Sequence, residues 1–228
     1  MISEEELKKY EPTYSAERLT AFIYSDDDTI DDIILRYKRN LMISQALYPE
    51  LCTLEVILRN SINYVLKTYI SETWIEDEIK NNTILEKSDY NLLLTAYENT
   101  KKECESSFKE ITMGKVVANL NFGFWTNLCV KKYNSRIWNK GACFKGVFVN
   151  FPTVKNDITV ISDKLYRIRK LRNRIFHYEQ VFKYPEKTLK LYNYIQEIMS
   201  YLPKDEFNVI SEMSTFMHLY QELTYNIK

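Results

Sequence analysis

Glycine and proline are scarce in this chain of 228 residues, which has four glycines and five prolines. Both residue types mark turns, so a chain that contains few of them has few sharp reversals and long regular elements. Apolar residues recur at helical spacing through most of the sequence, and 45% of all residues are hydrophobic. The sequence therefore predicts an all-α protein with enough apolar side chains for a sizeable core.

Metal-ligating residues are also few. Only two histidines occur, and the four cysteines, which form no CxxC pair, are Cys52, Cys104, Cys129 and Cys143. A structural zinc site needs ligands at short spacing, so no metal is predicted, and no cofactor is expected. The cysteines stand among apolar neighbours, which is typical of core side chains in a reducing compartment.

Long apolar runs are missing as well. No uninterrupted run approaches the roughly 20 residues that a membrane-spanning helix needs. The first ten residues, MISEEELKKY, are acidic and polar, unlike a signal peptide. These absences predict a soluble cytoplasmic protein that has no membrane partner.

Net charge is absent, because 31 basic residues balance 31 acidic ones. The chain as a whole is therefore not a polyelectrolyte partner for nucleic acid. The charge is nevertheless uneven: the segment KLYRIRKLRNR at 164–174 contains six cations and no acid, whereas DDDTIDD at 26–32 is acidic. A local basic segment can bind phosphate. The acidic run is interpreted as a helix N-terminus, where the helix dipole favours Asp, rather than as a cation site.

Capping residues and prolines place the helix boundaries. Ser15 has the position of an N-cap for the helix AERLTAFIY. A helix is predicted over 29–48, and Pro49 is expected to begin the next one, since a first helical residue needs no N–H donor. Residues 71–87 look irregular around Trp74, and 135–154 are predicted to be a loop with one short helix. Further helices are predicted at 88–108 with Ser88 as cap, 112–133, 155–180, 186–202 and 205–225. One domain over 1–228 is expected, in which the helices of 1–48 pack on a bundle of 49–228.

The stretch LRNRIFHYE at 171–179 carries the chemistry. Arg172 offers a planar fork that matches phosphate oxygens, and His177 can exchange a proton at neutral pH. Asn173 is four residues before His177, so on a helix it shares a face with the imidazole and can hold it by a hydrogen bond. Arg172 is about 140° around the axis from His177, so the two can flank a groove or meet one phosphate when a second helix closes the site. The alternative is a solvated basic helix face with no such role.

The upstream segment LEVILRN contains Glu55 and Arg59, four residues apart. The simpler interpretation is an internal ion pair along a helix. The other interpretation places Arg59 or Asn60 near the His177 helix as a support. His218 is interpreted as an ordinary packed or exposed histidine, and some of the 18 tyrosines could stack on unpaired bases.

The motif LRNRIFHYE resembles the signature of the HEPN superfamily of helical ribonucleases, in which Arg and a polar residue precede a His. It is most similar to the Abi-like (abortive infection) branch of prokaryotes, which tends to read R-N-R-I-x-H-H-E. Three upstream blocks resemble that branch in the right order: YSAERLTAFI, YKRNLMISQALYPELCTLEVILRNSINYVL and VVANLNFGFW. The resemblance covers about residues 12–182. Phe176 and Tyr178 depart from it, where relatives have a small residue and a second His.

The resemblance implies a HEPN-like helical bundle with additional N-terminal helices and a catalytic role for Arg172, Asn173 and His177. Around them, RNA-binding roles are predicted for Arg169, Lys170, Arg174 and Tyr178. Supporting roles are predicted for Glu55, Arg59, Asn60 and Glu179. The activity implied is metal-independent endoribonuclease cleavage, in which the 2′-OH of RNA supplies the nucleophile.

The partners follow from the single histidine of the motif. General acid–base cleavage is easier with two, so a homodimer that joins two such helices is expected. A toxin or phage-defence role, with an antitoxin protein or an inhibitory RNA as restraint, is implied by analogy. Two alternatives remain: a non-catalytic module that binds RNA or a protein, and a purely structural helical dimer.

Overall fold

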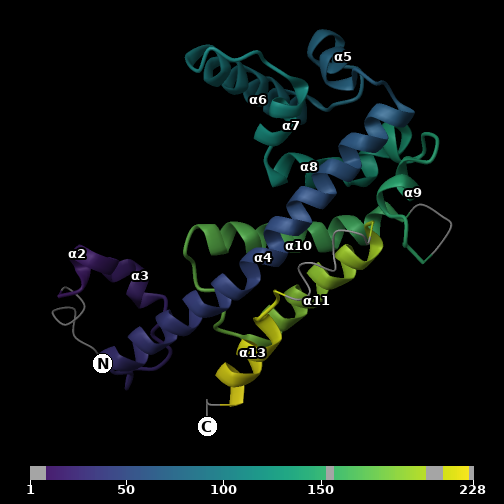
Figure 1. Ribbon diagram of the computed structural model, residues 1–228. Coiled ribbons are helices and arrows are strands. Elements are labelled where there is room, and N and C mark those ends of the chain that lie inside the picture. Colours follow the sequence, from purple (N-terminus) through teal and green to yellow (C-terminus); the bar gives the residue numbers. More distant parts are fainter. Residues whose placement is uncertain (1–8, 153–156, 204–212, 226–228) are drawn as a thin grey trace. The chain divides into compact units, whose positions relative to one another are not determined.

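The computed structural model describes residues 9–152, 157–203 and 213–225. Over these residues the chain forms helices, turns and loops without a β-strand, which confirms the predicted all-α class for them (Figure 1). The α-helices are α2 (Glu11–Tyr14), α3 (Ala16–Thr20), α4 (Ile30–Tyr69), α5 (Trp74–Asn81), α6 (Lys87–Ser106), α7 (Met113–Asn119), α8 (Phe122–Leu128), α9 (Cys143–Val147), α10 (Ile158–Phe176), α11 (Pro185–Tyr201) and α13 (Phe216–Tyr225). Two short helical turns, η1 (Lys131–Tyr133) and η2 (Asn134–Trp138), precede α9.

The contacts divide the chain into two compact units. The first unit contains the described residues of 9–52, 170–194 and 213–225, and the second contains those of 53–152, 157–169 and 195–203. The boundary between them falls within α4, α10 and α11. The predicted single domain over 1–228, with 1–48 packed on 49–228, stays a prediction.

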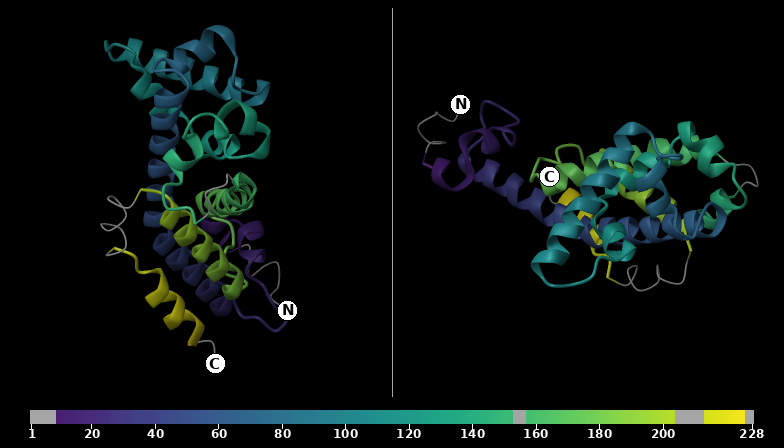
Figure 2. Two further views of the ribbon diagram at one scale, coloured as in Figure 1. Left: turned by 90° about the vertical axis from the view of Figure 1, so that its right-hand side faces the viewer. Right: turned by 90° about the horizontal axis from the view of Figure 1, so that it is seen from above.

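The core of the first unit begins with an aromatic cluster. The rings of Phe22 and Tyr14 each meet the Tyr37 ring edge to face, with centroids 5.4 Å apart. At the other end of the chain, Phe216 of α13 stacks on Tyr192 of α11 with centroids 4.2 Å apart, and Figure 2 shows these two helices alongside each other. Such pairs stabilise beyond the area that they bury.

The second unit is built around three buried tryptophans, Trp74, Trp125 and Trp138. Each indole N–H donates a hydrogen bond, as a buried indole requires. Their acceptors are Asn63 Oδ1 at 3.0 Å, Leu120 O at 3.2 Å and Leu128 O at 2.7 Å. Cys104, Cys129 and Cys143 are buried too, which confirms that they are core side chains; Cys52 is half-buried.

Two side chains cap the helices that directly follow them in the sequence. Ser15 Oγ accepts from Arg18 N–H at 3.3 Å and caps α3, and Thr112 Oγ1 accepts from Lys115 N–H at 3.4 Å and caps α7. α11 begins at Pro185, one residue before the start predicted for the helix over 186–202. The predicted loop over 135–154 contains η2 and α9, and the predicted helix over 205–225 is seen as α13, with 204–212 outside the described residues.

Several predicted boundaries are wrong, beginning with the helix predicted over 16–24, which ends at Thr20. Pro49 lies inside α4 instead of beginning a helix, so position 49 offers no N–H to the carbonyl of Gln45. Residues 74–81 form α5, and α6 begins at Lys87 after Glu86 rather than at a Ser88 cap. The single helix predicted over 112–133 is interrupted at Leu120, because Asn121 Oδ1 accepts from Phe124 N–H at 2.9 Å and starts α8. The helix predicted over 155–180 ends at Phe176.

Among the described helices, α4 alone is long and apolar enough to cross a membrane, judged by length and composition. Helices of that kind also form the cores of soluble proteins. The expectation of no membrane partner therefore stays a prediction.

Candidate functional site

α10 carries the basic segment of 164–174, and its apolar residues are on one stripe. The buried ones are Ile161, Leu165, Ile168, Leu171 and Ile175, which repeat every three or four residues. The cations fall between them, so they lie on the remaining faces of the helix; Arg167, Lys170 and Arg174 are exposed. This pattern fixes the rotation of α10 and places the motif 172–177 at its C-terminal end.

α10 ends in a hydrogen-bonded turn. Tyr178 N–H donates to Ile175 O at 3.0 Å, and Glu179 N–H donates to Arg174 O at 2.9 Å. This is the Schellman pattern, in which the residue after the helix cap is left-handed, and Tyr178 has a φ of +57°. Tyrosine rarely adopts that conformation, so contacts elsewhere must hold the turn.

His177 precedes Tyr178 at this helix end. Its N–H donates to Asn173 O at 2.9 Å, so its backbone continues the helical pattern although α10 ends at Phe176. The side chains of His177 and Asn173 are both exposed. The predicted hydrogen bond from the Asn173 side chain to the imidazole stays a prediction.

Asn40, on α4, holds the segment that follows the turn. Its Nδ2 donates to Glu179 O at 3.2 Å, and its Oδ1 accepts from Val181 N–H at 2.7 Å and from Phe182 N–H at 3.2 Å. Asn40 is 2% exposed, and a buried polar network that is fully hydrogen-bonded makes the local structure rigid. Asn40 is therefore a positioning residue for the His177 turn, and its partners are too distant in sequence to have revealed it.

Replacement of Asn40 by Ala is expected to destabilise the fold by about 2–3 kcal/mol. The reason is that two buried backbone N–H groups would lose their acceptor. Thermal or urea unfolding measures the change. Asn99→Ala, at an exposed position on α6, is the matched control and should change stability by less than about 0.5 kcal/mol. An Asn40→Ala protein as stable as the wild type would remove Asn40 from this role.

The His177 hollow is a polar depression of about 530 Å³ in the first unit. It is lined by Ser15, Glu17, Arg18, Ala21, Phe22, Arg174, His177, Tyr178, Glu179 and Gln180. The hollow therefore brings the end of α10 together with α3 and the residues that flank it. Of the predicted site residues, it unites His177 with Arg174, Tyr178 and Glu179.

Two arginines flank this hollow, and each has a partner. Arg174 Nε lies 3.3 Å from Glu179 Oε2, and its Nη2 donates to Gln180 O, so it reinforces the turn. Arg18 Cζ lies 5.5 Å from the centroid of the Tyr178 ring, a cation–π arrangement. Arg18 could not be identified from the sequence, because only the fold brings α3 beside the end of α10.

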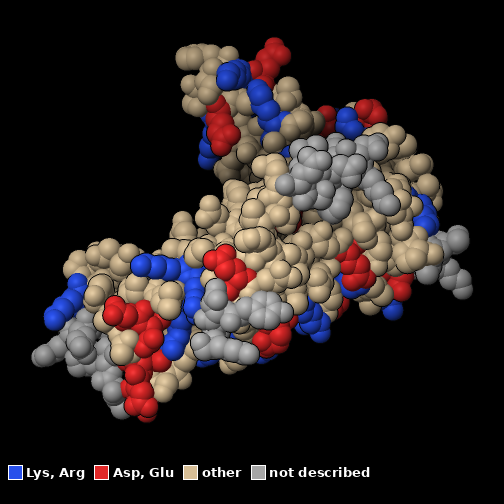
Figure 3. Space-filling view, turned by 60° about the horizontal axis from the view of Figure 1, so that its bottom comes forward, with Lys and Arg blue, Asp and Glu red and all other residues tan. Residues whose placement is uncertain are grey.

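On the face shown in Figure 3, basic and acidic residues are interspersed, so any anion-binding site there is local.

Arg172 is directed toward a different surface. Its Cζ lies 4.1 Å from the centroid of the Phe176 ring, and Phe176 stacks on Tyr48 with centroids 5.6 Å apart. Arg172 is not among the described residues that line the His177 hollow. The wide angle between positions 172 and 177 on a helix explains the separation.

Phe176 and Tyr48 border an apolar hollow of about 760 Å³ in the first unit. It is lined by Leu41, Met42, Ser44, Gln45, Ala46, Tyr48, Pro49, Ile175, Phe176, Tyr178, Thr215 and Leu219. Phe176 is 40% exposed, Met42 41% and Tyr48 48%, so the apolar surface reaches solvent. Tyr178 lines both hollows, and the two therefore adjoin at the end of α10.

The two cations before the motif differ in environment. Lys170 is exposed, whereas Arg169 is half-buried in the second unit and donates to α8. Its Nη1 reaches Asn127 Oδ1 at 2.5 Å, Thr126 Oγ1 at 3.3 Å and Gly123 O at 3.4 Å. Arg169 thus joins α10 to α8, and the RNA-binding roles proposed for both cations stay predictions.

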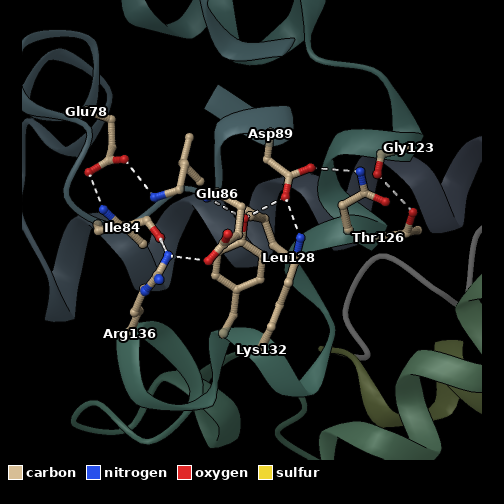
Figure 4. Close-up of polar contacts among 12 residues, drawn as sticks. Glu78, Ile84, Glu86, Asp89, Gly123, Thr126, Leu128, Lys132 and Arg136 are labelled. Atoms are coloured by element: carbon tan, nitrogen blue, oxygen red, sulfur yellow. Dashed lines mark hydrogen bonds and ion pairs between the residues drawn. The ribbon is translucent and has the colours of Figure 1, made fainter. Parts of the chain in front are cut away.

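Asp89, at the first turn of α6, is the centre of the polar core of the second unit (Figure 4). It is 0% exposed, and it accepts from Asn127 Nδ2 at 2.8 Å, Lys132 Nζ at 3.1 Å and Tyr133 Oη at 2.6 Å. Burial, and next the hydrogen bond to Asp89, raise the pKa of Tyr133 above its usual range. Because a buried carboxylate is stable only when it is paired, this network is structural. Local sequence does not reveal this network, since the partners of Asp89 lie 38–44 residues away along the chain.

The residues predicted to support the site from upstream lie in the second unit. Arg59 Nε donates to Asn60 Oδ1 at 3.2 Å, and both line a small hollow that includes Asn63 and Lys67. Glu55 is half-buried one turn before Arg59. Neither the Glu55–Arg59 ion pair nor an approach of Arg59 or Asn60 to His177 has been tested, so both stay predictions.

Comparisons with known proteins give no family for this chain. No protein-family model, no curated protein and no solved structure matches it. Within the described residues, no group of three or more His, Cys, Asp or Glu side chains is placed to hold a metal ion. Any function must therefore be inferred from the site itself and from the resemblance of the motif.

Proposed function

We propose that this protein is a metal-independent endoribonuclease of the Abi-like branch of the HEPN superfamily, with a HEPN-like helical bundle. It acts in the cytoplasm as a toxin or phage-defence effector, restrained by an antitoxin protein or an inhibitory RNA. The observation that carries the proposal is the placement of His177. An exposed imidazole stands at the capped end of α10, in a polar hollow with two guanidinium groups.

Each residue of the motif has a chemical task. His177 accepts the proton of a ribose 2′-OH, whose oxygen attacks the adjacent phosphorus. The bond from phosphorus to the 5′ oxygen breaks, and that oxygen takes up a proton, so the products end in a 2′,3′-cyclic phosphate and a 5′-OH. Arg172 stabilises the charge that develops on the phosphoryl oxygens. Asn173 orients the imidazole of His177.

A second copy of the chain completes this site. One His177 can act as the base or as the acid in a given step, and the reaction uses both. In one chain Arg172 lies against Phe176, away from the His177 hollow. A twofold dimer along α10 would supply a second imidazole and bring the Arg172 fork of one copy to the hollow of the other.

The purified protein is expected to cut single-stranded RNA in the presence of EDTA. The 2′-OH is an internal nucleophile and the guanidinium groups supply the positive charge, so divalent ions should add little. Gel assays would follow cleavage, and mass spectrometry would identify a cyclic phosphate at the new 3′ end. An oligonucleotide with one 2′-deoxy position should resist at that position alone. Intact RNA with a folded dimer, with or without divalent ions, would contradict the proposal.

A second candidate is a non-catalytic module that binds RNA or a protein. The apolar hollow next to Phe176 favours a protein partner, since exposed apolar patches of this kind mark interaction sites. The two candidates differ in their dependence on His177. Cleavage requires that imidazole, whereas binding in the apolar hollow depends on residues such as Met42 and Tyr48.

A further inference from the structure

A second hollow adjoins the His177 hollow in the first unit. This tyrosine hollow, of about 380 Å³, is lined by Phe22, Tyr24, Asp32, Leu35, Arg36, Arg39, Asn40, Gln180, Phe182, Lys183 and Pro185. Phe22 and Gln180 line both hollows, so the two are continuous along the residues that follow α10. None of the motif residues lines it, and the proposed chemistry does not use it.

One exposed tyrosine ring, that of Tyr24, lines this hollow, and a second, that of Tyr184, shares the lining residue Lys183 with it. Tyr24 is 43% exposed, and Tyr184, which neighbours Lys183 and Pro185 in sequence, is 50% exposed. Gln180 Nε2 donates to Tyr24 Oη at 3.0 Å and so holds that ring in place. Rings that are exposed yet positioned can receive another flat ring at little further entropic cost.

Cations lie over both rings. Lys183 Nζ is 4.9 Å from the centroid of Tyr24 and 6.0 Å from that of Tyr184, and Lys187 Nζ is 4.1 Å from that of Tyr184. Arg36 Cζ is 4.2 Å from the centroid of Tyr24. Both lysines are exposed, so a base can take their place on a ring while the ammonium groups turn to a phosphate.

Two acids of the run 26–32 near the hollow, Asp28 and Asp32, are engaged in holding the chain. Asp28 accepts from Arg36 Nη2 at 2.7 Å and from Tyr24 N–H at 2.6 Å. Asp32 accepts from Thr29 N–H at 2.9 Å at the start of α4. Among the lining residues, Arg36, Arg39 and Lys183 outnumber the single carboxylate of Asp32. Arg36 is paired with Asp28, so the lining taken together with Asp28 has a net charge of +1.

Aromatic rings interleaved with cations are the features by which proteins bind single strands of nucleic acid. We infer that the tyrosine hollow is a binding subsite for unpaired bases of an RNA strand, stacked on Tyr24 and Tyr184, with Lys183 and Lys187 on the flanking phosphates. The strand continues into the His177 hollow, and this last step rests on the proposed function. A duplex does not fit, because its bases are stacked on each other and offer no free face.

The subsite can be tested in the full-length chain carrying His177→Ala, so that no RNA is cut. The probe is a fluorescein-labelled single-stranded RNA of ten nucleotides, compared with the matched duplex at one salt concentration. Tyr24→Ala and Tyr184→Ala should each weaken single-strand binding about tenfold. Tyr24→Phe and Tyr184→Phe should retain most of it, because phenylalanine still stacks. Tyr64→Ala, which removes a tyrosine that is 65% exposed elsewhere on the chain, should have no effect.

Leucine variants at positions 24 and 184 serve if the alanine variants unfold, because leucine fills space but cannot stack. The subsite would be overturned if a double variant at positions 24 and 184 bound the single strand as tightly as the chain with both tyrosines. It would also be overturned if the chain bound the duplex as tightly as the single strand. Failure of the proposed function is a separate result. If the chain with His177 intact cuts no RNA, yet the tyrosine variants lose binding, the subsite stands and the catalytic proposal falls.

Discussion

Replacement of His177 by Ala is expected to lower RNA cleavage by about 10²–10⁴-fold, the range typical of a lost general acid–base group. Binding of the uncut RNA should change by only a few-fold, since a neutral imidazole adds little to phosphate attraction. Cleavage in vitro, growth after induced expression and filter binding at fixed salt would measure the three effects. Salt must be held constant, because phosphate affinity depends on it.

The chain provides its own control for this experiment. His218 is the other histidine, and it lies exposed on α13. His218→Ala should cleave RNA as the wild type does. His177→Gln, which keeps a polar side chain of similar size, should be as inactive as His177→Ala if the proton transfer matters. Full toxicity in His177→Ala, or a loss of helix content in both His177 variants, would make this histidine structural.

Arg172 separates catalysis from binding in the same assays. Arg172→Ala should weaken both, because it removes a charge-assisted fork that contributes about 1.5–3 kcal/mol. Arg172→Lys should recover part of the binding and little of the cleavage, since lysine keeps the charge without the planar geometry. Asn173→Ala should fall between the wild type and His177→Ala in rate.

Replacement of Asp89 by Ala is expected to destabilise the protein by about 3–5 kcal/mol, the range for breaking a buried charged network. The variant would leave the buried Tyr133 hydroxyl and the half-buried Asn127 amide without their acceptor. Urea unfolding should show a lower midpoint, with part of the protein unfolded at physiological temperature.

The matched control is Asp163→Ala on α10. Asp163 pairs with Arg167 one turn away, and both side chains are more than half exposed. Exposed pairs of this kind contribute little, so a change below about 0.5 kcal/mol is expected. Equal stability of Asp89→Ala and Asp163→Ala would show that the buried network does not hold the second unit together.

The sequence predicted features that depend on neighbours a few residues away. The cap at Ser15 and the helix start at Thr112 need only a local side chain, and each was found where expected. The cap expected at Ser88 was not found, since α6 begins at Lys87. The prediction that Pro49 begins a helix was also local, and it was wrong. Leu47 and Leu51 are buried on either side of Pro49 and keep α4 continuous. Burial of the flanking turns outweighed one lost hydrogen bond.

Some residues of the candidate site can be identified from the sequence, and others only from the fold. His177 and Arg172 could be identified because both lie in one motif of nine residues. Asn40 and Arg18 could not, since each meets the end of α10 only after the chain has folded back. No rule of spacing connects a buried amide to a loop that lies far along the chain.

The hydrogen bonds from Asn40 join positions that are 139–142 residues apart in the sequence. During synthesis, the turn that presents His177 cannot be held until the segment through Phe182 has left the ribosome and reached α4. Closure of so long a loop is also entropically costly and comes late in folding. A nascent or truncated chain would therefore carry the motif without the geometry. For the nuclease activity proposed above, this delay would keep the nascent chain from cutting the transcript from which it is being translated.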